Sequence, residues 1–340
     1  MRPLSALVAA FALTRFAHGL SSSLTPVDAF VSTSPEVAMW VYVPETGNST
    51  DSSQAIVVAI HSCERTADYY YENTGYASLA DQYGYIVIYP NASTPSGCWD
   101  TTTSKSTTRN GGGDSQAIVN MVAYAVKNFN GNASRVAVTG SSSGGIMVNL
   151  LAGLYPDVFQ AASVFSGEYA DDIYDYSGSR PKMMIYHGTI DATYPYSNLG
   201  EELDGWSSVL DVTFSNNITD SPSPGYTKMV YGDGLKLVGV SAAGVGHTVP
   251  VDAVTDLSWF CIAPECDGDG LPFEQLEQLD ELNQFNKLGG SFELQHRLDK
   301  LGGSFELQRR LDKFQSLQSV EWDRYNYLRF LHGREQEDSQ

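Results

Sequence analysis

Long apolar runs and positive charge are both scarce in this chain of 340 residues. The one pronounced apolar stretch, Leu4–Leu13, is too short to span a bilayer, and no later stretch reaches the required length. Lysine and arginine together number 20 against 40 acidic residues, which gives a formal net charge of −20. Binding to nucleic acid or to an anionic membrane needs basic patches. We therefore expect neither as a partner, and we expect the chain to act as a monomer.

Cysteine is also sparse, with four residues in all: Cys63, Cys98, Cys261 and Cys266. No histidine lies at metal-ligand spacing from them, so we expect no metal site. In an oxidising compartment an even number of cysteines favours two disulfides, and four cysteines allow three connectivities. The favoured pairing is Cys63–Cys98 with Cys261–Cys266, because the last two are close enough in the chain to close a short loop.

The first residues have the layout of a secretory signal peptide. Arg2 precedes the apolar stretch, and the small residues Ala17 and Gly19 follow it, which predicts a signal peptide over 1–19. A buried N-terminal helix is the alternative. Secretion is also indicated by four Asn-x-Ser/Thr triplets without proline, each a potential glycosylation site. They begin at Asn48, Asn91, Asn132 and Asn217.

Charge density divides the rest of the chain in two near Ala263. Residues 264–340 carry 25 charged side chains in 77 positions, against 35 in the first 263. A near-perfect duplication lies in this tail, at 287–299 and 300–312, and Gly-Gly interrupts each copy. This pattern predicts short helices rather than one long rod, and two copies are too few for a solenoid. We expect one domain at 20–263 and a loosely attached, partly helical, non-catalytic tail at 264–340.

Strand-like and helix-like segments alternate through the domain, which predicts an α/β fold with a mostly parallel sheet and helices on both faces. The predicted strands are 39–43, 55–60, 86–89, 135–139, 160–165, 182–186 and 236–240. The predicted helices are 114–128, with Asp114 as N-cap, 144–154 and 198–209.

Residues 140–144 (GSSSG) form a G-x-S-x-G motif between a predicted strand and a predicted helix. An esterase needs its serine on such a tight turn, with Oγ exposed and a helix N-terminus behind it. In a chain rich in glycine and serine, a flexible turn is the alternative, but the strand–turn–helix context favours Ser142 as a nucleophile. The Ser143 N–H then faces the developing oxyanion.

A serine hydroxyl needs a neighbouring base. His247 lies in a glycine-rich loop after the last predicted strand, where α/β-hydrolases place the triad histidine. Asp191 lies between Ser142 and His247 in the chain, just beyond a strand and a Gly turn, and is the favoured acid. His61 and His187 directly follow apolar strands, so they are interpreted as structural. The rival acids are Asp171, Asp172, Asp175 and Asp211.

A second oxyanion donor is expected in the loop after an early strand, where Cys63 is the favoured residue and Ser62 the second choice. Trp99 is a candidate to lie beside the substrate, and a half-buried structural role is equally compatible with its position. Residues 110–114 (NGGGD) are not a phosphate loop, because the spacing and the lysine of that motif are missing.

Several separate segments resemble one known family. They include VVAIHSC, YGYIVIYPNAS, NGGGDSQAIVNMV, VAVTGSSSGGIMVNLLAGLYPDVFQAASVFSG, PKMMIYHGTIDATYPYSNLGEEL and GVGHTVPVD. In order through residues 24–262, the chain resembles the fungal acetylxylan esterases of carbohydrate esterase family 1. These are close to feruloyl esterases and polyhydroxybutyrate depolymerase-like proteins. The resemblance implies an α/β-hydrolase that deacetylates xylan without a cofactor, with Ser142, Asp191 and His247 as its triad.

The chain departs from this family in two places. Family members usually carry a longer, cysteine-containing segment after the strand that ends in FSG, whereas here a shortened crossover spans 166–180. The tail resembles neither a family linker nor a cellulose-binding module. Feruloyl esterase and polyhydroxyalkanoate depolymerase remain alternatives within the enzyme class. The alternative outside it is a non-catalytic, carbohydrate-binding or misfolded product of a shortened gene.

Overall fold

The computed structural model describes residues 22–34, 37–45, 53–92, 94–170 and 176–262. The predicted signal peptide, the predicted tail and Cys266 lie outside these ranges, and so does the predicted pairing of Cys261 with Cys266. The other predicted disulfide, Cys63–Cys98, is confirmed.

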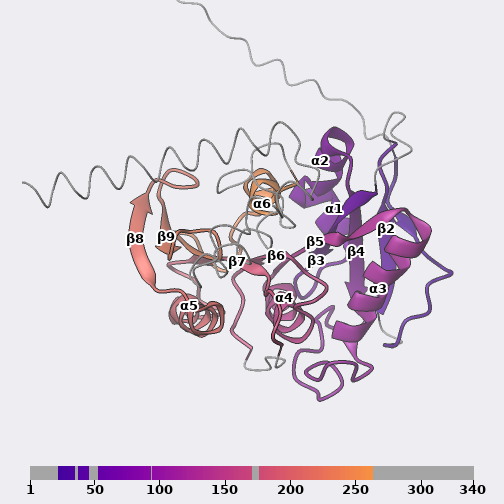
Figure 1. Ribbon diagram of the computed structural model, residues 1–340, viewed down its shortest axis with the longest axis horizontal. Helices are drawn as coiled ribbons and strands as arrows, with labels where there is room; N and C mark the ends of the chain where they lie inside the picture. Colours follow the sequence, from indigo (N-terminus) through magenta and orange to yellow (C-terminus); the bar gives the residue numbers. More distant parts are fainter. Residues whose placement is uncertain (1–21, 35–36, 46–52, 93, 171–175, 263–340) are drawn as a thin grey trace, which may run out of the picture. The chain divides into compact units, whose positions relative to one another are not determined.

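In the described part of the chain the strands form one sheet in the order β1-β2-β4-β3-β5-β6-β7-β10-β9-β8 (Figure 1). The six strands from β4 to β10 in this order are parallel, and the two outer strands on each side are antiparallel. The prediction of a mostly parallel sheet is therefore confirmed. The strands are β1 (Thr25–Pro26), β2 (Val37–Tyr42), β3 (Gln54–Ile60), β4 (Ile86–Ala92), β5 (Gly131–Ser141), β6 (Ala161–Phe165), β7 (Lys182–Gly188), β8 (Phe214–Thr219), β9 (Tyr226–Tyr231) and β10 (Leu237–Ala242).

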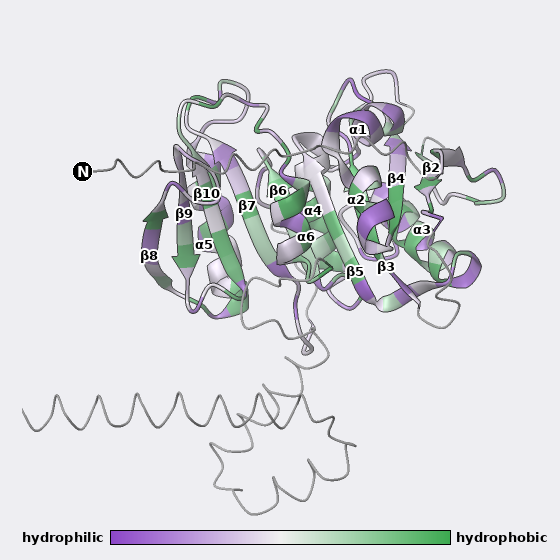
Figure 2. Ribbon diagram, turned by 90° about the horizontal axis from the view of Figure 1, so that it is seen from above, coloured by the Kyte–Doolittle hydropathy of each residue, from purple (hydrophilic) through white to green (hydrophobic). Residues whose placement is uncertain are grey.

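Helices cover both faces of the sheet, as predicted. The first face packs against α3 (Asp114–Asn128), α4 (Ser143–Leu154) and α5 (Ser197–Leu210). The second packs against α1 (Ala67–Thr74), α2 (Tyr76–Tyr83) and α6 (Ala253–Trp259). Because helices cover both faces, the central strands are buried on both sides and are apolar without alternation. Figure 2 shows this as hydrophobic colour concentrated in the middle of the sheet.

Helix α3 has the predicted bounds, but its predicted cap is wrong. Gly113 is the N-cap, and Asp114 lies in the first turn with 4% of its surface exposed. Its carboxylate accepts hydrogen bonds from the Ser34 hydroxyl at 2.7 Å and from the Asp100 amide at 3.0 Å. Asp114 thus fixes two distant segments to the start of the helix instead of capping it.

The shortened crossover joins neighbouring parallel strands. Residues 166–181 connect β6 to β7, which pair directly from Ala161–Lys182 to Phe165–Tyr186. A parallel connection needs about a dozen residues or more and is usually helical. Its described residues, 166–170 and 176–181, contain no helix. The short segment therefore reaches the next strand without a helix along those residues.

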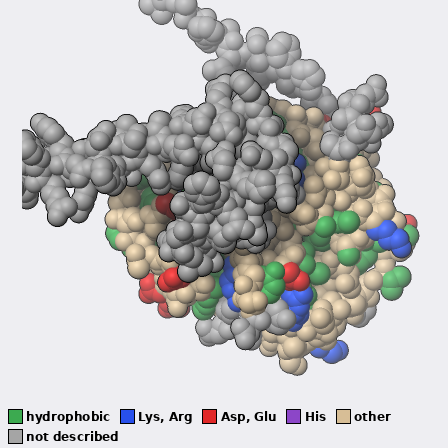
Figure 3. Space-filling model, in the orientation of Figure 1, with side chains coloured by type: hydrophobic (Ala, Val, Ile, Leu, Met, Phe, Trp, Pro, Cys, Tyr) green, Lys and Arg blue, Asp and Glu red, His purple; other side chains and the backbone are tan. Residues whose placement is uncertain are grey.

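Each helix within the described ranges falls short of the length and apolar character that crossing a membrane requires. On the face drawn in Figure 3, the Lys and Arg side chains that the structure describes do not gather into one patch, and some of them lie beside Asp or Glu side chains.

Candidate active site

Ser142 lies on a tight turn between the end of β5 and the start of α4. Its backbone has φ 56° and ψ −122°, a conformation that residues other than glycine rarely adopt. Neighbouring hydrogen bonds hold the turn: the Ser142 N–H donates to the Phe165 carbonyl at 2.8 Å, and the Ser142 carbonyl accepts from the Ile146 N–H at 3.0 Å. The Tyr70 hydroxyl lies 2.8 Å from the Ser141 hydroxyl and braces the same turn.

The two glycines of the motif allow backbone segments to approach each other closely. A Cβ atom on Gly140 would lie 2.5 Å from the Gly144 carbonyl oxygen. A Cβ atom on Gly144 would lie 2.5 Å from the Ile60 carbonyl oxygen and 2.6 Å from that of His61. These three separations are too short for a side chain, so glycine is required at both positions. The close approach also places the start of α4 directly against the loop that follows β3.

The structure brings the three predicted triad residues together. The His247 Nε2 atom lies 2.8 Å from Ser142 Oγ, and its Nδ1 atom lies 2.8 Å from Asp191 Oδ2. A carboxylate only accepts hydrogen bonds, so the proton of the neutral ring is on Nδ1 and Nε2 accepts from the serine hydroxyl. This chain of hydrogen bonds has the order required to activate a serine.

Asp191 is held as an ionised group. Its side chain is 0% exposed, and its Oδ1 atom accepts hydrogen bonds from the Thr193 and Tyr194 amides at 2.8 and 3.0 Å. Burial alone raises the pKa of this carboxyl. The bonds from His247 and the two amides outweigh burial and lower the pKa below its ordinary value.

None of the rival acids takes this place in the described structure. Asp211 is the exposed C-cap of α5. Asp171, Asp172 and Asp175 lie outside the described residues.

The loop that carries His247 packs on the loop that carries Asp191. A Cβ atom on Gly188 would lie 2.2 Å from the Val245 carbonyl oxygen, so a glycine is needed at the end of β7. The Ile190 amide donates to the same carbonyl at 3.1 Å. The Tyr194 ring packs edge-on against the His247 ring, with centroids 5.1 Å apart. These contacts fix the histidine while leaving 23% of its side chain exposed.

The predicted oxyanion donors, Cys63 and Ser143, lie in the two backbone segments that Gly144 brings together. Neither amide donates a hydrogen bond to another described residue. The Cys63–Cys98 disulfide ties the first segment to the loop after β4. The Ser62 carbonyl, in the same segment, accepts a hydrogen bond from His61 Nδ1 at 2.8 Å. Whether these amides bind an oxyanion stays a prediction.

Trp99 is buried against His61. Only 4% of it is exposed, and its indole N–H donates to the His61 carbonyl at 2.7 Å. The Ala92 amide donates to His61 Nε2 at 3.1 Å, and burial lowers the pKa of His61 although the bond to the Ser62 carbonyl opposes this. This arrangement favours a structural role for both residues, and the substrate contact of Trp99 stays a prediction.

The predicted glycosylation sites differ in exposure. Asn217 is exposed on β8. Asn132 and Asn91 are half-buried, and their side-chain oxygens accept hydrogen bonds from the Ser134 and Ala67 amides. Asn48 lies outside the described residues.

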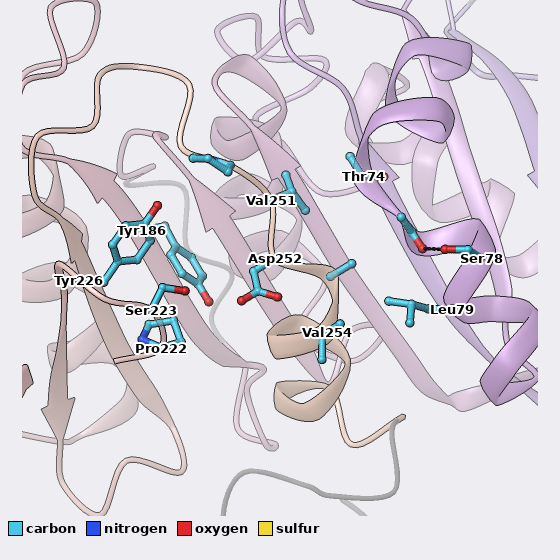
Figure 4. A pocket seen from close by; sticks show the side chains of 13 residues that line it. Thr74, Ser78, Leu79, Tyr186, Pro222, Ser223, Tyr226, Val251, Asp252 and Val254 are labelled. Atoms are coloured by element: carbon cyan, nitrogen blue, oxygen red, sulfur yellow. Dashed lines mark hydrogen bonds between the residues drawn. The ribbon is translucent and has the colours of Figure 1, made fainter. Parts of the chain in front are cut away.

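A hollow of about 460 Å³ lies apart from the triad, between the α1–α2 junction, the start of α6 and the β8–β9 turn (Figure 4). Its lining contains no triad residue. The Ser78 hydroxyl donates to the Gly75 carbonyl, and the Asp252 carboxylate caps α6. Because these polar groups are already bound within the chain, we assign the hollow no role in the chemistry.

Fold and site together define the class of the protein: it is an α/β-hydrolase. The chain matches the family described as Esterase PHB depolymerase over residues 38–187. It is 42% identical over 278 residues to feruloyl esterase B of Talaromyces funiculosus, with 72% of this chain and 78% of that protein covered. It is 38% identical over 280 residues to acetylxylan esterase A of Aspergillus awamori, with 72% and 90% covered.

A solved structure of acetyl xylan esterase from Aspergillus awamori matches with a TM-score of 0.66 and 37% identity. The match covers 71% of this chain and all of that one. The chain therefore belongs to the family of the fungal acetylxylan and feruloyl esterases, and it is a carboxylic ester hydrolase.

Sequence reasoning missed the surroundings of the triad. Tyr70 on α1 contacts the Ser141 hydroxyl, and His187 at the end of β7 contacts Asp191. The Tyr194 ring, in the loop after β7, packs on His247. The one signal for His187 was its position four residues before Asp191.

Proposed function

We propose that the chain is a secreted serine esterase that removes acetyl groups from acetylated xylan. The observation that carries the proposal is the continuous chain of hydrogen bonds from Ser142 through His247 to Asp191. The similarity to proteins named acetylxylan esterase supports the substrate class. The N-terminal signal-peptide pattern and the Cys63–Cys98 disulfide support secretion.

The reaction proceeds in two acyl-transfer steps. His247 Nε2 accepts the Ser142 proton as Oγ attacks the acetyl carbonyl, and the amides of Ser143 and Cys63 stabilise the oxyanion. Protonated His247 then gives the proton to the departing sugar oxygen, which leaves an acetyl group on Ser142. Water attacks this ester with His247 again as base, which releases acetate and restores the serine. No step requires a cofactor.

Feruloyl ester hydrolysis is the second candidate. Relatives named feruloyl esterase B match this chain at 42% and 40% identity. Next to Asp191, the side chain of Ile190 is 65% exposed, and Tyr194 packs on the catalytic histidine. Such apolar surface suits an aromatic acyl group better than it suits acetyl.

The test measures acetate release from acetylated xylan and ferulate release from feruloylated arabinoxylan by the full secreted chain. Ser142→Ala is the control. Acetate release that disappears in Ser142→Ala supports the proposal, whereas release of ferulate alone supports the second candidate. If the folded wild type releases neither acid and does not react with a fluorophosphonate, the chain is the non-catalytic product of a shortened gene.

A further inference from the structure

A second histidine lies against the triad acid. His187 is the penultimate residue of β7 and is fully buried. Its Nε2 atom lies 3.1 Å from the Tyr194 carbonyl oxygen and 3.2 Å from Asp191 Oδ2. Its Nδ1 atom has no hydrogen-bond partner among the described residues.

This geometry defines the tautomer of the ring. Nε2 faces two oxygen atoms that only accept hydrogen bonds, so it carries the proton. A proton on Nδ1 would leave a buried donor without an acceptor, which is costly. The Nε2–H is directed to the Tyr194 carbonyl, and the same N–H lies within contact distance of the Asp191 carboxylate.

The ring is itself held from a rigid part of the fold. β7 is a central strand, and His187 pairs with Ser241 of β10 in its register. The Tyr196 ring packs edge-on against His187, with centroids 6.4 Å apart, and its hydroxyl donates to Ser241 at 2.8 Å. The histidine thus has little freedom to follow a movement of the Asp191 loop.

We propose that His187 is a positioning residue that fixes the orientation of the Asp191 carboxylate, an inference that rests on the proposed function. Asp191 Oδ1 binds the Thr193 and Tyr194 amides, so the carboxylate and the Asp191–Tyr194 turn form one unit. His187 fastens this unit to β7 through the Tyr194 carbonyl. It also leaves Oδ2 facing two N–H groups, one from His187 and one from His247.

Removing the His187 N–H has two consequences. The turn loses its link to β7, so the triad spends less time in the productive geometry and kcat falls. The Asp191 Oδ2 atom also loses the N–H that lies 3.2 Å from it, so its charge holds a protonated His247 more strongly. The acidic limb of the pH profile of kcat/KM therefore moves to higher pH. Among the described residues, the other titratable groups near Asp191 are Tyr194 and, beyond it, Glu168.

Three substitutions separate positioning from simple packing. His187→Leu removes both nitrogen atoms. His187→Gln keeps an N–H near the position of Nε2, whereas His187→Asn moves it to the position of Nδ1, where the chain has no acceptor. Each full-length variant is assayed on 4-nitrophenyl acetate from pH 4 to 9, beside the wild type and Ser142→Ala, and its thermal midpoint is measured.

We expect kcat to fall about tenfold in the Leu and Asn variants and to stay within about threefold of wild type in the Gln variant. The acidic limb should move up by about half a pH unit in the Leu and Asn variants. In the Gln variant it should lie at the same pH as in the wild type. The proposal is overturned if all three His187 variants lose thermal midpoint to the same extent and none of them shifts the acidic limb. If His187→Leu does not fold, the comparison of Asn with Gln decides. A wild type as inactive as Ser142→Ala refutes the proposed function instead.

Discussion

Ser142 occupies a backbone conformation that its neighbours enforce. A φ of 56° with ψ of −122° is unfavourable for any residue with a Cβ atom, and such strain costs about 1–3 kcal/mol. The Phe165 carbonyl and the glycines on either side hold the turn in place. The strained turn therefore lowers the stability of the fold while it holds the Ser142 hydroxyl in place.

Two variants that both lack the hydroxyl measure this strain. We expect Ser142→Gly to be more stable than Ser142→Ala by about 1 kcal/mol, because glycine adopts this conformation without a steric penalty. Chemical denaturation of both variants gives the difference. If the Ala variant is the more stable one, the turn is not strained in solution. Neither variant should release acid from an ester.

At the scale of elements, α4 depends on how closely it approaches β3. Gly144 and Gly200 both lie in helices, but their surroundings differ. A Cβ atom on Gly144 would meet two backbone carbonyl oxygens within 2.6 Å, whereas one on Gly200 would meet nothing within 4 Å. A fixed backbone atom cannot move aside as a flexible side chain can.

The matched substitutions Gly144→Ala and Gly200→Ala test this contact. The first should destabilise the fold by about 2 kcal/mol or more and reduce kcat, because α4 must move away from the loop after β3. The second should stabilise the fold by about 0.5–1 kcal/mol, since alanine favours a helix, and should leave kcat unchanged. Unfolding midpoints and initial rates check both. An active, stable Gly144→Ala variant contradicts the packing argument.

The elements that the sequence predicts are those whose burial follows a simple pattern. Helix α3 was predicted with its observed bounds because its apolar residues repeat with helical spacing. β8 was missed because all six of its residues are exposed, which leaves no alternation to recognise. α1 and α2 are eight residues each and meet at Gly75, so neither is long enough for a periodic signal.

The candidate site shows the same division. The positions of Ser142, Asp191 and His247 were predictable because motif and chain order constrain them. Trp99 and His187 were not, because their contacts depend on which loops and strands lie side by side. Tertiary packing, rather than local sequence, brings the Trp99 indole to the His61 carbonyl. It likewise brings His187 next to Asp191.

At the scale of the whole molecule, buried carboxyl groups lie on both faces of the sheet. Burial raises the pKa of Glu202 on α5 to about 8, although a hydrogen bond from Asn149 opposes the shift. Burial likewise raises the pKa of Asp256 on α6 to about 7, against opposing hydrogen bonds that include one from Tyr76. Both groups hold a proton in the folded chain over a pH range in which the unfolded chain has released it.

The fold should therefore lose stability as pH rises from 5 to 8. In this window the folded state binds more protons than the unfolded state, so the free energy of unfolding falls with pH. Each group contributes about 1.4 kcal/mol per pH unit at most over its own range. Urea unfolding at several pH values measures the slope.

Glu202→Gln is the control for this prediction, because an amide resembles the protonated carboxyl and does not titrate. It should flatten the slope while preserving the bond with Asn149. A slope identical to that of the wild type would show that Glu202 does not titrate between pH 5 and 8.

The glycines around Ser142 and His247 also bear on how such esterases diverge. The frame of the site is made by main-chain atoms packed against Gly140, Gly144 and Gly188, so it does not depend on which side chains face the solvent. An exposed neighbour such as Ile190 can be exchanged during evolution without disturbing that frame. Relatives that match this chain at 42% and 38% identity are named for two different esterase activities, so a shared frame of this kind is compatible with more than one acyl group.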